Sequence, residues 1–317
     1  MSFIRHRPLL ITLAVLLGLF ASCAVQFPFV LSARVIGNLL TDNAFLCLLA
    51  IGMTVVIISG GIDLSVGAVL AFTGVLLAQL ISRYHVDPML AFALALLVGT
   101  SFGAMQGAAI HFLGAPPFIV TLAGMFLARG SCFLITEDSI PINASFYARF
   151  SDAGLPLPGG AILSPAALIM LGAVGAGTLL LRGTRFGASV YAIGGDRRAS
   201  ELLGISLGRN TIAIYAISGA CAAAGGILYS LYTQSAYPLA GTGMELDAIA
   251  AAIIGGTLLS GGYGSVLGTL PGVLILGLIQ LYITLEGTLS SWVGKIMTGI
   301  LLLFFIAVQR FFSHSDY

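Results

Sequence analysis

The residues from Pro88 to Ala128 include no Asp, Glu, Lys or Arg, and this run constrains the fold more than any other feature. A helix needs roughly 20 apolar residues to cross the hydrocarbon core of a bilayer, so the run predicts two successive spanning helices. Gly114 to Pro117 supply the turn between them. Across the whole chain only 8% of residues are charged, against roughly 25% in soluble domains. The sequence predicts an all-α, polytopic membrane protein that forms a single transmembrane domain over residues 1–317.

Uncharged segments separated by loop signals predict about ten spanning helices. Their expected ranges are 9–31, 43–59, 64–82, 89–111, 116–136, 161–181, 211–232, 244–259, 265–286 and 290–310. An even number of spans places both termini on one side of the membrane. That side receives the Lys and Arg residues at positions 5, 7, 182, 185, 197, 198, 209 and 310, and the other side receives those at 34, 83, 129, 149 and 295. The excess of basic residues predicts cytoplasmic N and C termini.

Two long loops follow from this topology. Residues 137–160 contain three acidic residues and three prolines, which predicts an irregular extracytoplasmic loop. Residues 182–209 form a cytoplasmic loop with five arginines. Inside it, Asp196 is a good N-cap and Gly204 a good C-terminal stop, so a short helix is expected between them.

The stretch GGIDLSVG at residues 60–67 places two glycines and a carboxylate between two uncharged apolar segments. Charged groups inside or at the edge of a membrane are functional candidates by default. Asp63 either lines a substrate pathway or caps the helix that begins near Leu64.

A second glycine-containing break repeats the first. Residues 59–80 and 260–281 align without a gap and share seven identities, which include the triplet Ser-Gly-Gly at the start of each. Paired helix breaks predict a substrate pathway in transporters built from repeats, because broken helices expose backbone groups that hydrocarbon cannot satisfy. Close helix packing through glycine is the alternative. The candidate pathway residues are Ser59, Gly60, Gly61, Asp63, Ser65, Asp247, Ser260, Gly261, Gly262 and Tyr263.

The motifs of several other protein classes are missing from the sequence. Lys295 is the one lysine, and its neighbours do not form a phosphate-binding GxxxxGK loop. The chain has no HExxH motif, and its four cysteines have no CxxC spacing. Basic residues are too dispersed for a nucleic-acid surface. The sequence therefore predicts no enzyme activity, no metal site and no cofactor in this chain.

Three longer motifs carry a resemblance to a known family. GGIDLSVGA at 60–68, TRFGASVYAIGGDRRASELLGIS at 184–206 and ELDAIAAAIIGGTLLSGGYGSVLGT at 245–269 resemble the permease subunits of bacterial ABC importers for ribose, galactose and related sugars. LTDNAF at 40–45, SIPIN at 139–143, YTQ at 232–234 and GTLSSW at 287–292 are most similar to one permease of the paired-permease galactofuranose importer. The chain is thereby identified as a candidate monosaccharide permease of the bacterial inner membrane.

This resemblance implies the partners that the chain would need. Such permeases work as two copies or two related chains, with separate cytoplasmic subunits that bind and hydrolyse ATP and a periplasmic sugar-binding protein. The resemblance also implies that the short cytoplasmic helix docks on the ATPase. The coupling residues would be Asp196, Arg197, Arg198, Glu201, Leu202, Leu203, Gly204 and Ile205, and the Arg197–Arg198 pair is more basic than the family pattern.

Two alternatives remain at the level of sequence. An ion- or proton-coupled secondary carrier would use Asp63 and Asp247 as titrating groups. A purely structural membrane scaffold would need neither residue, and the paired breaks disfavour it. A co-purifying ATPase would support the importer, whereas proton-driven uptake by the chain alone would support the carrier.

Overall fold

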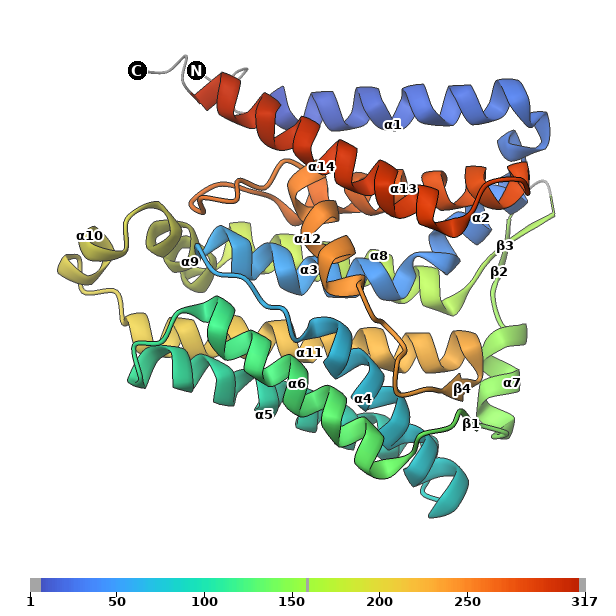
Figure 1. Cartoon of the computed structure of the whole chain (residues 1–317), viewed down its shortest axis with the longest axis horizontal. Coiled ribbons are helices and arrows are strands. Elements are labelled where there is room, and N and C mark those ends of the chain that lie inside the picture. The colour runs from blue at the N-terminus through green and yellow to red at the C-terminus, as the bar shows by residue number, and fades with distance from the viewer. Residues whose placement is uncertain (1–6, 158–159, 314–317) are drawn as a thin grey trace.

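The computed structural model describes residues 7–157 and 160–313 and shows a bundle of long, roughly parallel helices (Figure 1). The helices are α1 (Arg7–Gln26), α2 (Ala33–Asp42), α3 (Ala44–Ile58), α4 (Val66–Ala78), α5 (Pro88–Phe112), α6 (Pro117–Ile135), α7 (Ser145–Asp152), α8 (Pro165–Gly183), α9 (Arg185–Gly195), α10 (Arg197–Leu202), α11 (Leu207–Thr233), α12 (Met244–Ile254), α13 (Val266–Glu286) and α14 (Ser291–Ser313). A 3-10 turn, Pro28–Leu31, follows α1, and a π-helical turn, Gln79–Arg83, follows α4. Four short strands, β1 (Ile140–Pro141), β2 (Leu155–Leu157), β3 (Ala161–Leu163) and β4 (Ser235–Ala236), pair as β1 with β4 and β2 with β3, both antiparallel.

Proline and small polar residues set where the outer helices begin. The Asp87 carboxylate accepts hydrogen bonds from the backbone N–H of Met89 and Leu90 at 2.9 and 3.3 Å, just before α5. Ser164 caps α8 in the same way through the N–H of Ala167. Pro88, Pro117 and Pro165 occupy the first helical turn, where the missing N–H costs nothing. The predicted turn at Gly114–Pro117 is confirmed.

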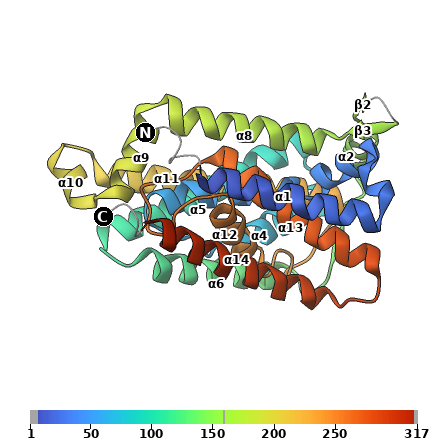
Figure 2. The ribbon, with the colours of Figure 1, turned by 90° about the horizontal axis from the view of Figure 1, so that it is seen from above.

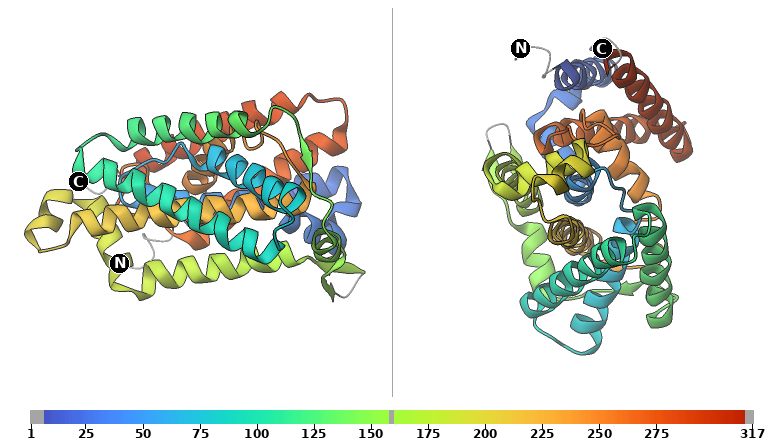
Figure 3. Two further views of the ribbon diagram at one scale, coloured as in Figure 1. Left: turned by 90° about the horizontal axis from the view of Figure 1, so that it is seen from below. Right: turned by 90° about the vertical axis from the view of Figure 1, so that its left-hand side faces the viewer.

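The long helices form a layered bundle. Viewed from the end that carries α10, α1 and α14 lie at one edge and α5 and α6 at the opposite edge (Figure 3). Nearly all of α3 is buried in the middle. α5 packs tightly on α11, since a Cβ at Gly103 would overlap the carbonyl of Tyr215 and one at Gly107 would lie 2.8 Å from Ile212 Cα. Small residues allow this close approach of two membrane helices.

The two ends of the bundle differ. α9 and α10 project at one end, called here the α10 end, where α1 begins and α14 finishes (Figure 1). α7 and the four strands lie at the other, called here the α7 end. The long segment predicted as an irregular loop over residues 137–160 contains α7, β1 and β2, so that prediction was wrong in part. Assignment of the α10 end to the cytoplasm stays a prediction, and Arg5 lies outside the described residues.

The number of spanning helices differs from the predicted ten. Within residues 7–157 and 160–313, eight helices are long and apolar enough to cross a membrane, and the pair α2 and α3, bent by 53°, makes a ninth. The expected span at 244–259 is instead α12, whose 11 residues extend about 16 Å, half the hydrocarbon thickness. α12 stands across the long axis of the bundle in Figure 1 and is seen end-on in Figure 2. Irregular backbone lies on both sides of α12.

Candidate substrate pathway and coupling surface

The first helix break lies between α3 and α4 and is organised by a buried carboxylate. Asp63 is 1% exposed. Its Oδ1 accepts hydrogen bonds from Ser65 N at 2.9 Å and Ser65 Oγ at 2.6 Å, so Asp63 caps the turn that opens α4. Its Oδ2 accepts from Ser218 Oγ of α11 at 2.7 Å. Gln106 of α5 donates to Ser65 Oγ at 3.0 Å. One carboxylate thus ties α4 directly to α11 and, through Ser65, to α5.

The second helix break surrounds α12. Residues 237–243 enter from the α7 end, and Arg129 of α6 donates to the carbonyls of Pro238 at 2.5 Å and Ala240 at 2.7 Å. These bonds satisfy backbone oxygens that no helix pairs. Beyond α12, residues 255–265 run toward the α10 end and return to α13 (Figure 1). The chain therefore passes from the α7 end to the α10 end as two irregular segments joined by one short helix.

The two Ser-Gly-Gly triplets meet at the α10 end. Gly262 N donates to the carbonyl of Ile58, the last residue of α3, at 2.8 Å. A Cβ at Gly261 would lie 3.0 Å from Gly60 Cα and 2.9 Å from the carbonyl oxygen of Gly194. The end of α9 therefore packs directly on both breaks. We call the contact among Gly60, Gly194, Gly261 and Gly262 the glycine junction.

A tyrosine strengthens the junction. The hydroxyl of Tyr191 in α9 donates to the carbonyl of Gly264 at 2.9 Å. Burial raises the pKa of this hydroxyl, while Arg182 opposes the shift. Tyr191 therefore stays a neutral donor at physiological pH. α9 is joined to residues 255–265 by both packing and a hydrogen bond.

α10 extends the same structure away from the bundle. Asp196 Oδ1 accepts from Ala199 N at 2.9 Å, and Gly204 has a φ of +81°, so the predicted N-cap and C-terminal stop are confirmed. Leu202 and Leu203 are 89% and 80% exposed. Arg197, Arg198 and Glu201 are exposed too, whereas Ile205 is half-buried. Two leucines on a charged protrusion form a surface suited to a protein partner.

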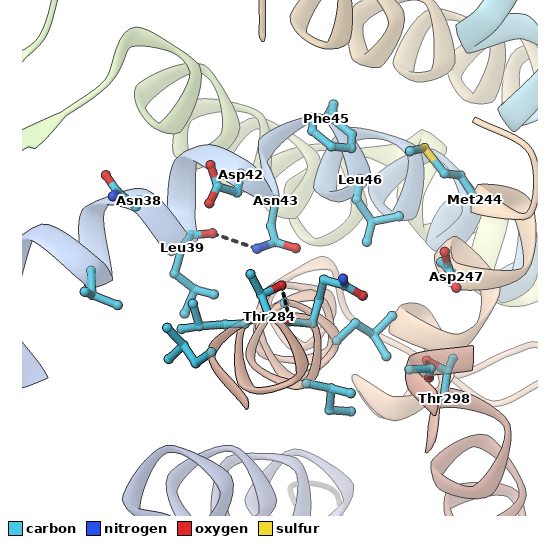
Figure 4. Close-up of a pocket in the computed structure, with 18 of the residues that line it drawn as sticks. Asn38, Leu39, Asp42, Asn43, Phe45, Leu46, Met244, Asp247, Thr284 and Thr298 are labelled. Carbon is cyan, nitrogen blue, oxygen red and sulfur yellow. Dashed lines mark hydrogen bonds between the residues drawn. The ribbon is translucent and has the colours of Figure 1, made fainter. Parts of the chain in front are cut away.

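A cavity lined by both polar and apolar side chains lies beside α12 (Figure 4). It has a volume of about 580 Å³ and lies between α2, α3, α12, α13 and α14. Lys295 of α14 donates to Asp247 of α12 at 2.6 Å, and the Asp42 carboxyl group lies beside Tyr232. The other polar side chains in its lining are Asn38, Asn43, Gln280, Thr284 and Thr298. We call this space the outer cavity.

The predicted pathway residues do not gather in one place. Ser59 to Gly61 and Ser260 to Tyr263 lie at or beside the glycine junction. Asp63 and Ser65 are enclosed by α5 and α11. Asp247 lies in the outer cavity. Their assignment to a substrate pathway remains a prediction.

Several residues of these sites were not singled out from the sequence. Ser218, Gln106 and Arg129 are isolated polar residues in apolar helices, and that isolation is the signal that could have identified them. Asp42 was recorded only within a short string, and Lys295 was considered only as a basic residue that does not belong to a phosphate-binding loop. Their approach to Tyr232 and Asp247 depends on the bend at α2 and on the position of α12, which the sequence pattern did not reveal.

An arrangement of long apolar helices, two helix breaks and a projecting helical loop is typical of a membrane transport protein. Residues 35–306 match the family described as "Branched-chain amino acid transport system / permease component", and the chain belongs to that family. It is a transport component of a membrane and not an enzyme.

Curated relatives cover nearly the whole chain. It is 55% identical over 306 residues to the "Inner membrane ABC transporter permease protein YjfF" of Escherichia coli K12, which covers 96% of this chain and 92% of the relative. It is 35% identical over 313 residues to the ribose import permease protein RbsC of the same strain, with 98% and 95% covered. The fructose import permease protein FruG of Bifidobacterium longum is 36% identical over 281 residues, with 87% and 82% covered. No solved structure matches the chain at a significant level.

Proposed function

We propose that this permease is the membrane subunit of an ATP-driven importer that carries a monosaccharide across the bacterial inner membrane. The observation that carries the proposal is the match, over nearly the full length of the chain, to permeases named for ABC transport and for ribose and fructose import. The family description mentions branched-chain amino acids, but the relatives at 35–36% identity are named for sugars. A neutral sugar needs hydrogen-bonding groups rather than a fixed charge, and the outer cavity offers amides, hydroxyls and carboxylates.

The particular sugar that we propose is galactofuranose. The support is the four short strings at residues 40–45, 139–143, 232–234 and 287–292. Two of them contribute to the outer cavity, since Asp42, Asn43, Phe45 and Tyr232 are among its lining residues. Ribose, fructose and D-allose, the sugars in the names of the relatives, are the competing substrates.

ATP hydrolysis is assigned to a separate subunit that docks on α10. Leu202 and Leu203 are exposed on a protrusion, as an apolar anchor requires. The link from this anchor to the membrane is the glycine junction, because α9 directly precedes α10 and its end packs on both helix breaks. Movement of α10 would therefore reach the α3–α4 break and residues 255–265 together, which is what alternating access demands of a coupling element.

A second permease chain is the third part of the proposal. Leu246 of α12 is 60% exposed, and Tyr237 and Leu239 of the irregular segment before it are 42% and 46% exposed. Non-helical backbone at membrane depth is tolerated only against protein or a water-filled cavity. A second copy or a related chain would cover this surface and enclose the pathway between the two permeases.

An ion-coupled carrier fits the geometry less well. Both oxygens of the Asp63 carboxylate accept hydrogen bonds inside packed helices, and Asp247 is paired with Lys295. None of the relatives described above is named as an ion-coupled carrier. The ion-coupled carrier is the alternative function that the transport experiment described next is designed to test.

The test is capture of the tagged permease from its native membrane, identification of its partners, and transport by the assembled complex in vesicles. We expect an ATPase subunit with a GxxxxGK loop, a second permease and a sugar-binding protein. We also expect ATP-dependent uptake of labelled galactofuranose to exceed that of ribose and fructose. Uptake driven by a proton gradient without the ATPase would contradict the proposal, and preference for ribose would contradict only the choice of sugar.

A further inference from the structure

The outer cavity has an uneven charge arrangement. Its described lining contains two carboxylates, Asp42 and Asp247, and one cationic group, Lys295. Lys295 is already engaged, because its Nζ lies 2.6 Å from Asp247 Oδ2. Asp42 lies beside the Tyr232 hydroxyl and has no cation of its own in the described lining. The cavity therefore presents a net negative charge to a solute.

The chemistry of the lining distinguishes neutral from anionic sugars. Carboxylates accept hydrogen bonds from hydroxyl groups, and amides both donate to them and accept from them; every neutral sugar carries several hydroxyl groups. A carboxylate or phosphate on a sugar needs a cationic partner, typically Arg or Lys. Here the single ammonium is held by Asp247, and the charge of an anionic sugar would also face the Asp42 carboxyl group, where like charges repel.

We propose that the Asp247–Lys295 ion pair, together with Asp42, makes the outer cavity a sugar-binding site that excludes anionic sugars. The pair withholds the cation that a sugar acid or sugar phosphate would require, and Asp42 supplies a hydrogen-bond acceptor for hydroxyl groups. This inference rests on the proposed function and adds residues that determine specificity within it. Selection by charge would then be made by the permease as well as by the soluble binding protein.

A structural role is the competing explanation for the ion pair. Asp247 lies in α12 and Lys295 in α14, so their contact also fastens a short crossing helix to its neighbour. A purely structural tie would affect assembly when broken but would not change which solutes bind. Binding of matched neutral and acidic sugars separates the two roles.

The experiment uses the full permease assembly in lipid nanodiscs and saturation-transfer NMR, which detects weak binding. D-galactose and D-galacturonate serve as probes, because they share a ring and differ by a carboxylate at C6. We expect the wild type to bind D-galactose at least about tenfold more strongly than D-galacturonate. Asp247→Asn leaves Lys295 unpaired and should raise D-galacturonate binding about tenfold, with D-galactose binding changed by less than about threefold. Asp152→Asn, an exposed carboxylate of α7, is the matched control and should leave both unchanged.

Three outcomes would overturn the inference: equal binding of the two probes by the wild type, binding of neither probe, or no gain of D-galacturonate binding in Asp247→Asn. Size-exclusion chromatography reports whether that variant assembles. If it does not, Asp42→Lys adds a cation while leaving the ion pair in place, and D-galacturonate must then bind more strongly. ATP-dependent uptake of neutral sugar by the wild type is measured in parallel. Its presence without charge selectivity refutes this inference alone, whereas its absence refutes the proposed function.

Discussion

Asp63 shows how the chain accommodates a carboxylate where the surroundings are apolar. Three hydrogen bonds, two from Ser65 and one from Ser218, surround its two oxygens. A buried carboxylate without such donors would be strongly destabilising. These bonds fix the start of α4 relative to α11, so we expect the side chain to act through the position of the helix break.

Substitution of Asp63 separates its shape from its charge. In Asp63→Asn, Oδ1 still accepts from Ser65 N, and the amide donates to Ser218 Oγ after the hydroxyl rotates, so we expect a loss of about 1 kcal/mol and partial transport. Asp63→Leu leaves the donors of Ser65 and Ser218 without partners, each costing about 1–3 kcal/mol, and should abolish transport. Thermal unfolding and ATP-dependent uptake measure the two effects. Equal loss in both variants would show that the charge itself is required.

The sequence located Asp63 but left its role open. A carboxylate beside two glycines is conspicuous in an uncharged stretch, and capping was one of the two predicted roles. Ser218 lies 155 positions away and Gln106 is 41 positions from Ser65. Such distant partners depend on how α5 and α11 pack, and no local pattern encodes that arrangement.

The glycine junction gives α9 a role that the sequence did not suggest. Gly194 and Gly195 occur in the sequence analysis only within the motif at 184–206, yet Gly194 is the point where α9 meets both breaks. A Cβ at Gly194 would overlap the carbonyl of Ile58 and lie 2.5 Å from Gly262 N. No neighbouring atom lies within 4 Å of a Cβ at Gly195. Gly194 and Gly195 therefore provide a test position and a matched control position for substitution by alanine.

We expect Gly194→Ala to separate α9 from the helix breaks and Gly195→Ala to be tolerated. The first change forces backbone atoms apart, because neither obstacle is a flexible side chain. It should reduce sugar-stimulated ATP hydrolysis and uptake by about tenfold or more while the permease remains in the membrane. Gly262→Val, whose Cβ would lie 2.9 Å from Gly195 Cα, should behave like Gly194→Ala. Normal uptake by Gly194→Ala would remove the junction from the coupling mechanism.

Leu203 of α10 provides a second prediction on coupling. Because the side chain is 80% exposed, Leu203→Asp should not change the stability of the permease itself. Burial of a leucine at a protein contact contributes roughly 1.5–3 kcal/mol, so the ATPase should bind about 10- to 100-fold more weakly. Co-purification and sugar-stimulated ATP hydrolysis test this. Leu155→Asp, an exposed leucine at the α7 end, is the control. Retention of the ATPase by Leu203→Asp would place docking elsewhere.

Helices with a long uncharged run were predicted well, and the shorter elements were not. α5, α6, α11 and α13 begin and end within about four residues of the expected ranges. α2 was missed because Arg34, Asn38 and Asp42 interrupt its apolar pattern. α12 was taken for a full span because the uncharged residues after it continue the apolar run, although Gly255 and Gly256 end the helix. Composition indicates where a chain enters the membrane, whereas glycine geometry decides where a helix stops inside it.

At the scale of the whole molecule, two parts of the surface differ in the backbone structure that they expose. α8 lies on the side opposite α6 and α14 (Figure 2), and it presents a continuous helix to its surroundings. Around α12 the chain instead presents a short helix with irregular backbone on either side. Lipid can cover the first kind of surface but not the second. This difference argues that the permease is complete only when paired with a second one.

Paired leucines on the two surfaces test that argument. Leu246 of α12 is 60% exposed and Leu179 of α8 is 71% exposed. Leu246→Ala should remove packing against the second permease and weaken the pair by roughly 1–3 kcal/mol. Leu179→Ala should not, because lipid fills the space that the side chain leaves. Native mass spectrometry of the solubilised complex measures the fraction with two permease chains. A complex with a single permease, or equal pairing of both variants, would mean that the α12 surface faces something other than a second permease.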